Sequence, residues 1–334
     1  MTGGQVSSAP LVSVGIPVFN GEATIRAAIE SVLAQTHEDL EVLVYNNGST
    51  DGTEAVVLAI ERDDSRVKYR AGNMNLGAHH SFSETFRMSS GLYFMWLAAD
   101  DRIEDSFVES GVTLLESDPN IGVSAPVVIA HLEGHDGPVY EVRVQGFEPD
   151  VPVFTKLVRT IRQLPVTCIY GLFRSEVLRT SESFTSGYMT DVAFMQEVAL
   201  RTAIVCNPDQ YLNYVMPTDW KTSEEEYFQY AGENSTHRPT VPALLLLRER
   251  LWRLWGVAPT RRQQIAYSVL VAGAEIWRLG WRALWRLVRK VCSRRRLRAL
   301  GTAFYWWRLH PGHTAVLDRG VFERRIVLPT LGLK

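Results

Sequence analysis

The sequence is poor in cysteine and has no long apolar run. Of the 334 residues, three are cysteines (Cys168, Cys206 and Cys292), and no two of them have C-x-x-C spacing. This excludes a disulfide framework and a thiolate zinc site, and it is typical of a reducing compartment. The first ten residues contain neither a basic nor an apolar segment, so we expect no signal peptide. No apolar run reaches the ~18–20 residues that span a bilayer.

The composition excludes several other classes of protein. With 46% apolar and 22% charged residues, the chain is neither mostly disordered nor a fibre nor a polytopic membrane protein. Its length predicts one large domain or two smaller ones. The G-x-G-x-x-G fingerprint is absent from the first predicted turn, which argues against a Rossmann oxidoreductase or methyltransferase.

The net charge of −2 conceals two oppositely charged parts. Between Ala243 and Arg308 there are fifteen Lys/Arg and two acidic residues, a balance of +13, so the rest of the chain carries −15. Seven of the nine tryptophans also lie between Trp252 and Trp307. We therefore expect three segments: a flexible N-terminus at 1–10, an α/β domain at 11–225 and a helical, Trp/Arg-rich region at 226–334.

Apolar runs alternate with helical patterns in the N-terminal two-thirds. Four runs predict strands, at Leu11–Phe19, Glu41–Tyr45, Val67–Arg70 and Leu92–Leu97. Strands that alternate with helices at this spacing are typical of βαβ units. The sequence therefore predicts a Rossmann-like, mostly parallel sheet with helices on both faces.

Polar clusters follow three of these runs directly, at Phe19–Glu22, Asn46–Thr53 and Asp100–Asp101. Ligands of such sheets bind outside the carboxyl ends of the strands, so we expect the clusters to meet at one edge. Two adjacent carboxylates after an apolar strand are costly unless positive charge neutralises them. A divalent cation holding a diphosphate would do so; capping of the helix near Ser106 is the alternative. The residues alone leave both open.

Four segments together resemble the family-2 glycosyltransferases. They are P-V-F-N-G-E, E-V-L-V-Y-N-N-G-S-T-D-G-T, N-L-G and A-A-D-D, and they occur in the family's order and spacing. The resemblance extends from Leu11 to about Tyr214. It implies a GT-A fold and transfer of a sugar from a nucleoside-diphosphate sugar to a hydroxyl acceptor, usually with inversion.

The resemblance also implies a donor site and a metal site. Asn47 would reach the nucleotide base, and Asp101 with Asp100 would hold Mg²⁺ or Mn²⁺. Ala98 replaces the first aspartate of the family's D-x-D-like motif. Asparagine both donates and accepts hydrogen bonds, so UDP-, dTDP- and GDP-sugars all stay open. The expected donor-site residues are Pro17, Phe19, Asn20, Glu22, Asn46, Asn47, Ser49, Gly77 and Asp100.

An inverting transferase needs a base that deprotonates the acceptor hydroxyl. The resemblance places this base at the start of a late helix, where the sequence reads G-Y-M-T-D-V-A-F-M, so we expect Asp191 to be the catalytic residue. Thr190 replaces the family's usual glutamate. Helix capping by Asp191 is an alternative compatible with catalysis. We expect Glu197 to be a solvated helix residue, and His79 and His80 to be exposed loop residues.

The C-terminal third predicts amphipathic helices. Tryptophans and arginines form adjacent ridges with four-residue spacing, at Trp277, Trp281 and Trp285 and at Arg278, Arg282 and Arg286. Such a helix can lie among lipid headgroups, or it can pack on the catalytic domain or on a second subunit, as in a homo-oligomer. We expect a cytoplasmic protein, with peripheral contact at the inner membrane face as one option. Without a recognised binding module, we expect no nucleic-acid partner.

The expected acceptor is a glycan or a lipid-linked molecule, in the synthesis of cell-surface polysaccharide, glycolipid or lipid-linked glycan. Two other functions compete with this one. One is a sugar-nucleotide pyrophosphorylase, which would need a basic, glycine-rich loop after the first strand. The sequence there reads F-N-G-E-A-T and has no basic residue. A non-catalytic, glycosyltransferase-like binding or scaffold protein is the other, because Ala98 departs from the motif.

Overall fold

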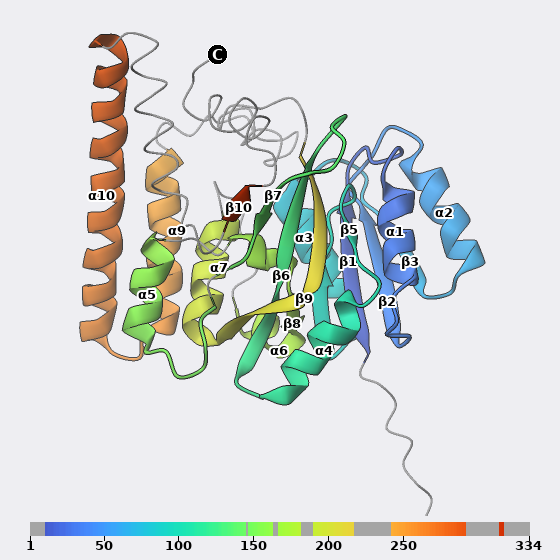
Figure 1. Ribbon diagram of the computed structural model, residues 1–334, viewed down its shortest axis with the longest axis horizontal. Helices are drawn as coiled ribbons and strands as arrows, with labels where there is room; N and C mark the ends of the chain where they lie inside the picture. Colours follow the sequence, from blue (N-terminus) through green and yellow to red (C-terminus); the bar gives the residue numbers. More distant parts are fainter. Residues whose placement is uncertain are drawn as a thin grey trace, which may run out of the picture.

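A computed structural model describes residues 11–144, 146–162, 166–181, 190–216, 242–291 and 314–316. The chain forms an α/β fold built on one sheet (Figure 1), as expected. Helices α1 (Ile25–Leu33) and α2 (Thr53–Asp63) lie at one side of the molecule, and the C-terminal helices lie at the opposite side.

The first half of the sheet is parallel. Its strands follow the order β4 (Tyr93–Trp96), β1 (Val12–Val18), β2 (Leu40–Asn46) and β3 (Val67–Ala71). β1 and β2 are buried almost throughout, as the continuous apolar runs predict. All four strands therefore end at the same edge of the sheet.

The other half makes the sheet mixed rather than mostly parallel. β8 pairs antiparallel with both β4 and β6, and β7 and β10 continue the antiparallel order beyond β6. Short connections such as the β6–β7 hairpin reverse the chain, and they leave no room for the crossover that a parallel pair needs. The strands are β5 (Arg102–Ile103), β6 (Ile121–Leu132), β7 (Pro138–Val142), β8 (Leu172–Arg174), β9 (Ala203–Met216) and β10 (Thr314–Val316).

Strand β8 joins the two halves, and β9 lies off this order, beside β6 and β5. β9 pairs parallel with β6 along most of its length and antiparallel with the short β5. β5 follows the Asp100–Asp101 pair directly, so β9 runs beside the expected metal site. The remaining helices of this domain are α3 (Ala78–Met88), α4 (Phe107–Ser117), α5 (Val153–Arg162), the 3₁₀ helix η1 (Val166–Tyr170), α6 (Ser175–Thr180) and α7 (Thr190–Arg201).

An aromatic cluster around Trp96 attaches α7 to the sheet. The Trp96 side chain is 2% exposed and meets Phe94, Phe173 and Phe194 edge to face, at centroid distances of 4.8, 5.7 and 6.2 Å. Its indole N–H donates to the carbonyl of Phe82 at 3.0 Å. Because Trp96 ends β4 and Phe194 belongs to α7, this packing fixes the helix against the strand that leads to Asp100.

The C-terminal region is helical, as predicted, with α9 (Pro242–Val257) and α10 (Arg261–Val291). Helix α9 packs on both α7 and α10. Trp252 and Trp255 of α9 are about half exposed. Within the part of the chain that the structure describes, no helix is sufficiently long and apolar to cross a bilayer. The side chains of the predicted tryptophan and arginine ridges on α10 lie outside the described residues, as does the predicted boundary near residue 225.

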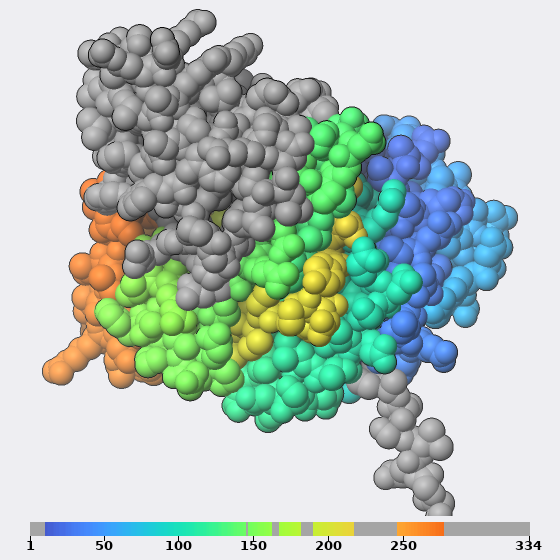
Figure 2. Space-filling model, viewed as in Figure 1, coloured from blue at the N-terminus to red at the C-terminus, as the bar shows by residue number. Residues whose placement is uncertain are grey.

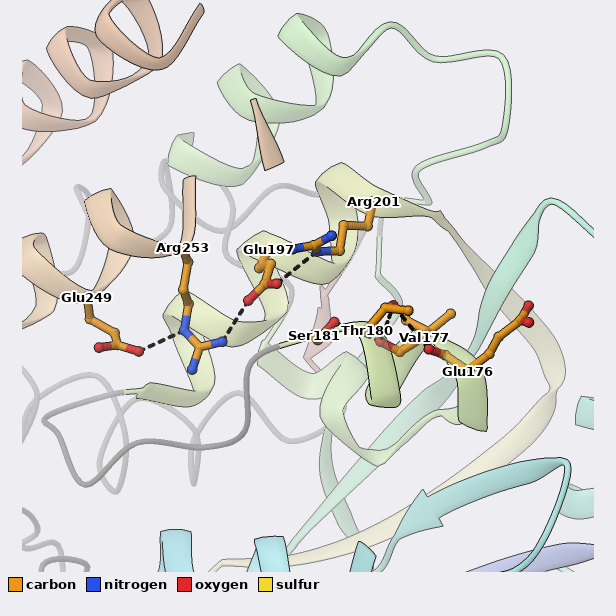
Figure 3. Close-up of polar contacts among 8 residues, drawn as sticks. All are labelled: Glu176, Val177, Thr180, Ser181, Glu197, Arg201, Glu249 and Arg253. Atoms are coloured by element: carbon orange, nitrogen blue, oxygen red, sulfur yellow. Dashed lines mark hydrogen bonds and ion pairs between the residues drawn. The ribbon is translucent and has the colours of Figure 1, made fainter. Parts of the chain in front are cut away.

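A buried network of ion pairs connects α9 to α7 (Figure 3). The Arg253 guanidinium donates to Glu197 of α7 at 2.7 Å and to Glu249 at 2.8 Å. The side chains of Arg253 and Glu197 are each 1% exposed. Glu197 also accepts from Arg201 at 2.8 Å. The prediction that Glu197 is a solvated helix residue is therefore wrong, because α9 covers it and supplies its counter-charge.

A second buried arginine completes the attachment. Arg250 of α9 donates to Gln196 of α7 at 2.6 Å, and it also pairs with Glu275 of α10. The side chain of Arg250 is fully buried. Two arginines thus join three helices, so the C-terminal helices are integrated with the α/β domain through α7.

We expect Arg253→Met to lower the free energy of unfolding by about 3–5 kcal/mol, because it leaves Glu197 buried without this partner. Urea unfolding followed by circular dichroism would measure the loss. The control is Arg26→Met, which removes an exposed ion pair with Glu30 and should change stability by at most ~0.5 kcal/mol. Adding Glu197→Gln to Arg253→Met should restore part of the loss. An unchanged urea midpoint in the single variant would contradict a stabilising network.

Candidate active site

The loop after β1 and the turn after β2 are joined by hydrogen bonds at the carboxyl edge of the sheet. Asn20 has a φ of 54°, the left-handed conformation that asparagine tolerates better than most residues. Its N–H donates to Ser49 Oγ at 2.8 Å, and its Oδ1 accepts from the Thr50 N–H at 2.9 Å. Asn20 and Ser49 are therefore neighbours, as expected of two donor-site residues.

A second set of bonds continues the same junction. The Glu22 N–H donates to Asp51 at 3.0 Å, and Glu22 Oε2 accepts from the Gly52 N–H at 2.9 Å. The Gly21 N–H donates to Thr53 Oγ1 at 2.9 Å. Glu22 is exposed, and its hydrogen bonds hold the turn after β2 against the loop after β1.

Asn46 and Asn47 are buried, and their amides bond within the protein. Asn46 Nδ2 donates to the Tyr69 hydroxyl at 2.8 Å, and Asn46 Oδ1 accepts from the Ser49 N–H at 2.9 Å. Asn47 Nδ2 donates to Asn75 Oδ1 and to the Gly77 carbonyl, at 2.9 and 3.1 Å. Asn47 Oδ1 accepts from the Leu76 N–H at 3.1 Å. Both donor hydrogens of Asn47 are thus occupied in holding the loop at 72–77 against β2.

Apolar side chains are exposed at this edge. Phe19, Met74 and Leu76 are each 41–43% exposed, whereas Pro17 is half-buried within β1. These groups offer a nonpolar surface beside the polar turn, and a planar base could pack there. Phe19 is an expected donor-site residue. Met74 and Leu76 were not predicted, although Leu76 lies within the N-L-G segment.

Gly48 makes the close approach between the two loops possible. Its φ is 76°, and a Cβ at this position would lie 2.6 Å from the backbone of Met74. Gly77, with a φ of 90°, precedes α3 and accepts hydrogen bonds from Asn47 and Ser81. The loop at 72–77 therefore lies directly on the turn after β2.

The two carboxylates after β4 have different environments. Asp100 is exposed, whereas Asp101 is fully buried. Asp101 Oδ1 accepts from the Val215 N–H of β9 at 3.0 Å, while its Oδ2 is buried without a hydrogen-bond partner in the described structure. Burial and the nearby Asp100 charge raise the pKa of Asp101 to about 8. The pKa of Asp100 is also raised, because the surrounding protein partly desolvates its carboxylate even though the residue reaches the surface. Val215 was not foreseen, because it lies 114 residues further along the chain.

These residues fit a hard divalent cation. A buried carboxylate oxygen without a partner is unfavourable, and a cation would compensate for it. Mg²⁺ is usually held by one or two carboxylates together with substrate phosphates. Among the described residues there is no cluster of three or more His, Cys, Asp or Glu side chains that could hold a metal ion. A cation at Asp100 and Asp101 would therefore take its other ligands from the substrate and from water.

Asp191 lies in the first turn of α7, as expected. It is half-buried, and burial raises the pKa of its carboxyl group, although its hydrogen bond with the Val192 N–H opposes this. The preceding residue, Thr190, is fully buried, and its Oγ1 lies 2.9 Å from Nδ1 of His79. His80 lies 3.1 Å from the Tyr45 hydroxyl. Both histidines are thus half-buried contact residues, and the expectation that they are exposed loop residues is wrong because α3 begins at Ala78.

We expect Gly48→Ala to destabilise the protein by more than the ~1–2 kcal/mol that a left-handed conformation costs alanine. The new Cβ would also collide with the Met74 backbone. Gly134→Ala is the matched control, since Gly134 has a φ of 71° but nothing lies within 4 Å of its added Cβ. Urea unfolding of both variants measures the difference. Equal losses would show that the loops do not approach this closely.

Comparison with known proteins identifies the family of this domain. Residues 13–176 match the family model described as Glycosyl transferase family 2. An uncharacterized glycosyltransferase of Haemophilus influenzae is 38% identical over 116 residues, which are 35% of this chain and 36% of that protein. The chain spans about a third or less of the length of the first curated relatives that it matches.

Two solved structures share the fold. The S. aureus TarS 1–349 structure in complex with UDP-GlcNAc superposes with a TM-score of 0.57 at 14% identity, covering 80% of this chain and 72% of that chain. The mannosyltransferase PcManGT from Pyrobaculum calidifontis, in complex with GDP-Man and Mn²⁺, gives a TM-score of 0.54 at 15% identity and covers 98% and 87%. At such identities the likeness concerns the fold, and it confirms the GT-A-type α/β fold with its C-terminal helices. The family model covers the chain from β1 to the start of α6 and the relatives agree with it, so residues 13–176 form a glycosyltransferase family 2 domain.

Proposed function

We propose that the protein transfers a sugar from a nucleoside-diphosphate sugar to a hydroxyl acceptor, with inversion at the anomeric carbon. The observation that carries this proposal is the buried Asp101, whose unpartnered oxygen lies beside the exposed Asp100 at the edge where β1, β2 and β4 end. This edge is where parallel sheets bind their ligands. The proposal further rests on membership of the family.

Asp100 and Asp101 would hold Mg²⁺ or Mn²⁺. Asp100 is the accessible member of the pair, and Asp101 is fixed in place by the Val215 N–H. A cation bound there would stabilise negative charge on the leaving nucleoside diphosphate. The PcManGT structure, with both GDP-Man and Mn²⁺, supports a divalent cation at this fold without deciding between Mg²⁺ and Mn²⁺ here.

The nucleoside would lie on the loops after β1 and β2, against the exposed Phe19, Met74 and Leu76. We assign Asn47 to the shaping of this surface, because its donor hydrogens are used within the protein. The choice of base stays open among UDP-, dTDP- and GDP-sugars. The two solved neighbours contain UDP-GlcNAc and GDP-Man, so the fold accepts more than one base.

Asp191 would remove the proton from the acceptor hydroxyl while that oxygen attacks the anomeric carbon. The raised pKa brings this carboxylate closer to neutral pH, where a base is most effective. The helix that carries Asp191 packs on β4 through Phe194 and Trp96, so the base helix and the strand leading to Asp100 form one rigid unit. Helix capping remains compatible with this role.

We further propose a glycan or lipid-linked acceptor and peripheral contact with the inner face of the cell membrane. Support comes from the half-exposed Trp252 and Trp255 on α9 and from the basic excess of the C-terminal third. Contact with a second subunit through the same helices is the alternative. Co-sedimentation with anionic vesicles, compared with the mass of the protein in free solution, distinguishes the two.

We expect a matching nucleotide sugar to raise the melting temperature more strongly with Mn²⁺ than without it. Asp100→Asn and Asp101→Asn should each abolish this metal-dependent increment, because each removes a cation ligand. A thermal-shift screen of UDP-, dTDP- and GDP-sugars, with and without Mn²⁺, makes the measurement. Asp105→Asn, a change of an exposed aspartate close by, should retain the increment. An increment that survives both site variants would overturn the metal assignment.

We expect Asp191→Asn to keep the donor-induced thermal shift and to lose transfer by at least ~100-fold. In the wild type the base must be ionised, and burial raises its pKa, so kcat should fall with decreasing pH through a pKa above ~3.9, the ordinary aspartate value. Release of nucleoside diphosphate, measured between pH 4 and 8, gives the profile. Normal transfer by the Asp191→Asn variant would contradict the assignment of Asp191 as the base. Donor binding without any turnover by the wild type would favour the non-catalytic alternative, and synthesis of the nucleotide sugar from a sugar phosphate would favour the pyrophosphorylase.

A further inference from the structure

The first turn of α7 is attached to helix α3 by a contact that the family resemblance does not imply. Thr190 occupies the position where the family usually has glutamate, and its hydroxyl lies 2.9 Å from His79 Nδ1. The two residues are 111 positions apart in the chain. Thr190 is 0% exposed, and a buried hydroxyl without a partner would cost about 1–3 kcal/mol. The contact with His79 therefore satisfies the hydrogen-bonding need of the buried Thr190 hydroxyl.

His79 is itself fixed to the loops at the edge of the sheet. It is the second residue of α3, and Gly77 directly before this helix accepts a hydrogen bond from Asn47 Nδ2 at 3.1 Å. The Gly77 N–H donates to Asn75 at 2.9 Å. A continuous series of contacts thus leads from the turn after β2, through the start of α3, to the residue before Asp191.

The rest of α7 is held by other contacts. Phe194 packs on Trp96, and Gln196 and Glu197 bond to Arg250 and Arg253 of α9. These ring contacts and hydrogen bonds begin three residues after Asp191, almost one helical turn away. Closer to Asp191, Val192 and Ala193 form an apolar cluster with Leu246 of α9. These contacts fix the body of the helix, whereas the His79 contact acts on its first residue, beside the carboxylate.

We propose that His79 and Thr190 form a positioning pair that fixes the first turn of α7, and with it Asp191, at a set distance from the nucleotide-sugar loops. This inference rests on the proposed role of Asp191 as the base. Neither residue needs to touch the substrate. The effect would lie in kcat, because a base displaced by a fraction of an ångström loses alignment with the acceptor hydroxyl while the donor still binds.

The test combines a structural and a kinetic measurement on the full-length protein. Thr190→Val removes the hydroxyl at similar volume, Thr190→Ser keeps it, His79→Ala removes the ring and His79→Gln keeps a hydrogen-bonding group. Thr180→Val is the matched control, because among the described residues the Thr180 hydroxyl bonds only to carbonyls within its own helix α6 (Figure 3). Hydrogen–deuterium exchange follows the amides of the first turn of α7, with those of its second half as internal reference. Release of nucleoside diphosphate from the nucleotide sugar that gives the largest thermal shift provides kcat and KM.

We expect Thr190→Val and His79→Ala each to speed exchange in the first turn and to lower kcat about tenfold, with donor KM changed less than twofold. The double variant should be no slower than the slower single variant, because both remove one contact. Thr190→Ser, His79→Gln and Thr180→Val should stay close to wild type. Unchanged exchange, unchanged kcat, additive losses or a loss confined to donor KM would each overturn the pair. If exchange responds but Asp191→Asn still transfers sugar, the contact is real while the base assignment, and the role built on it, fail.

Discussion

The site depends on the parallel pairing of β1 with both of its neighbours. Val12 is in register with Leu40 of β2 on one side and with Tyr93 of β4 on the other, so the three strands run together and end at one edge. Every polar cluster that follows these strands is thereby delivered to the same place. The burial of β1 and β2 on both faces makes this arrangement costly to disrupt, since separating the strands would expose their apolar side chains to water.

Helix α7 links the sheet to the C-terminal helices. Its aromatic contact with Trp96 places it on the sheet, and its buried ion pairs join it to α9. A buried pair of charges is seldom a large net source of stability compared with apolar packing, but it tolerates few alternative geometries. The C-terminal helices thus support α7 and are not a separate attachment.

The sequence predicted the parallel strands, the amphipathic helices and the positions of Asp100, Asp101 and Asp191, because periodicity and local motifs carry this information. It could not predict which side chains bond to each other when they lie far apart in the chain. Asn47 bonds to Asn75 across 28 residues, and Glu197 bonds to Arg253 across 56. A polar residue on a helix is usually solvated, and only the tertiary packing of α9 shows that Glu197 is not. The antiparallel pairing of β8, β6, β7 and β10 could not be predicted for a similar reason, since a strand pattern does not show which strand lies beside it.

The pairing of both glutamates of α9 and α10 with buried arginines affects the outer surface of those helices. Among their described side chains, the charged groups that remain exposed are Arg248, Arg261 and Arg262. The acidic excess lies in the rest of the chain, and α1 and α2 lie on the opposite side of the molecule (Figures 1 and 2). The described outer surface of α9 and α10 is therefore basic, despite the near-neutral total charge of the chain. At an ionic strength of 0.01 M, where fields extend about 30 Å, this surface attracts anionic groups, and physiological salt weakens the attraction.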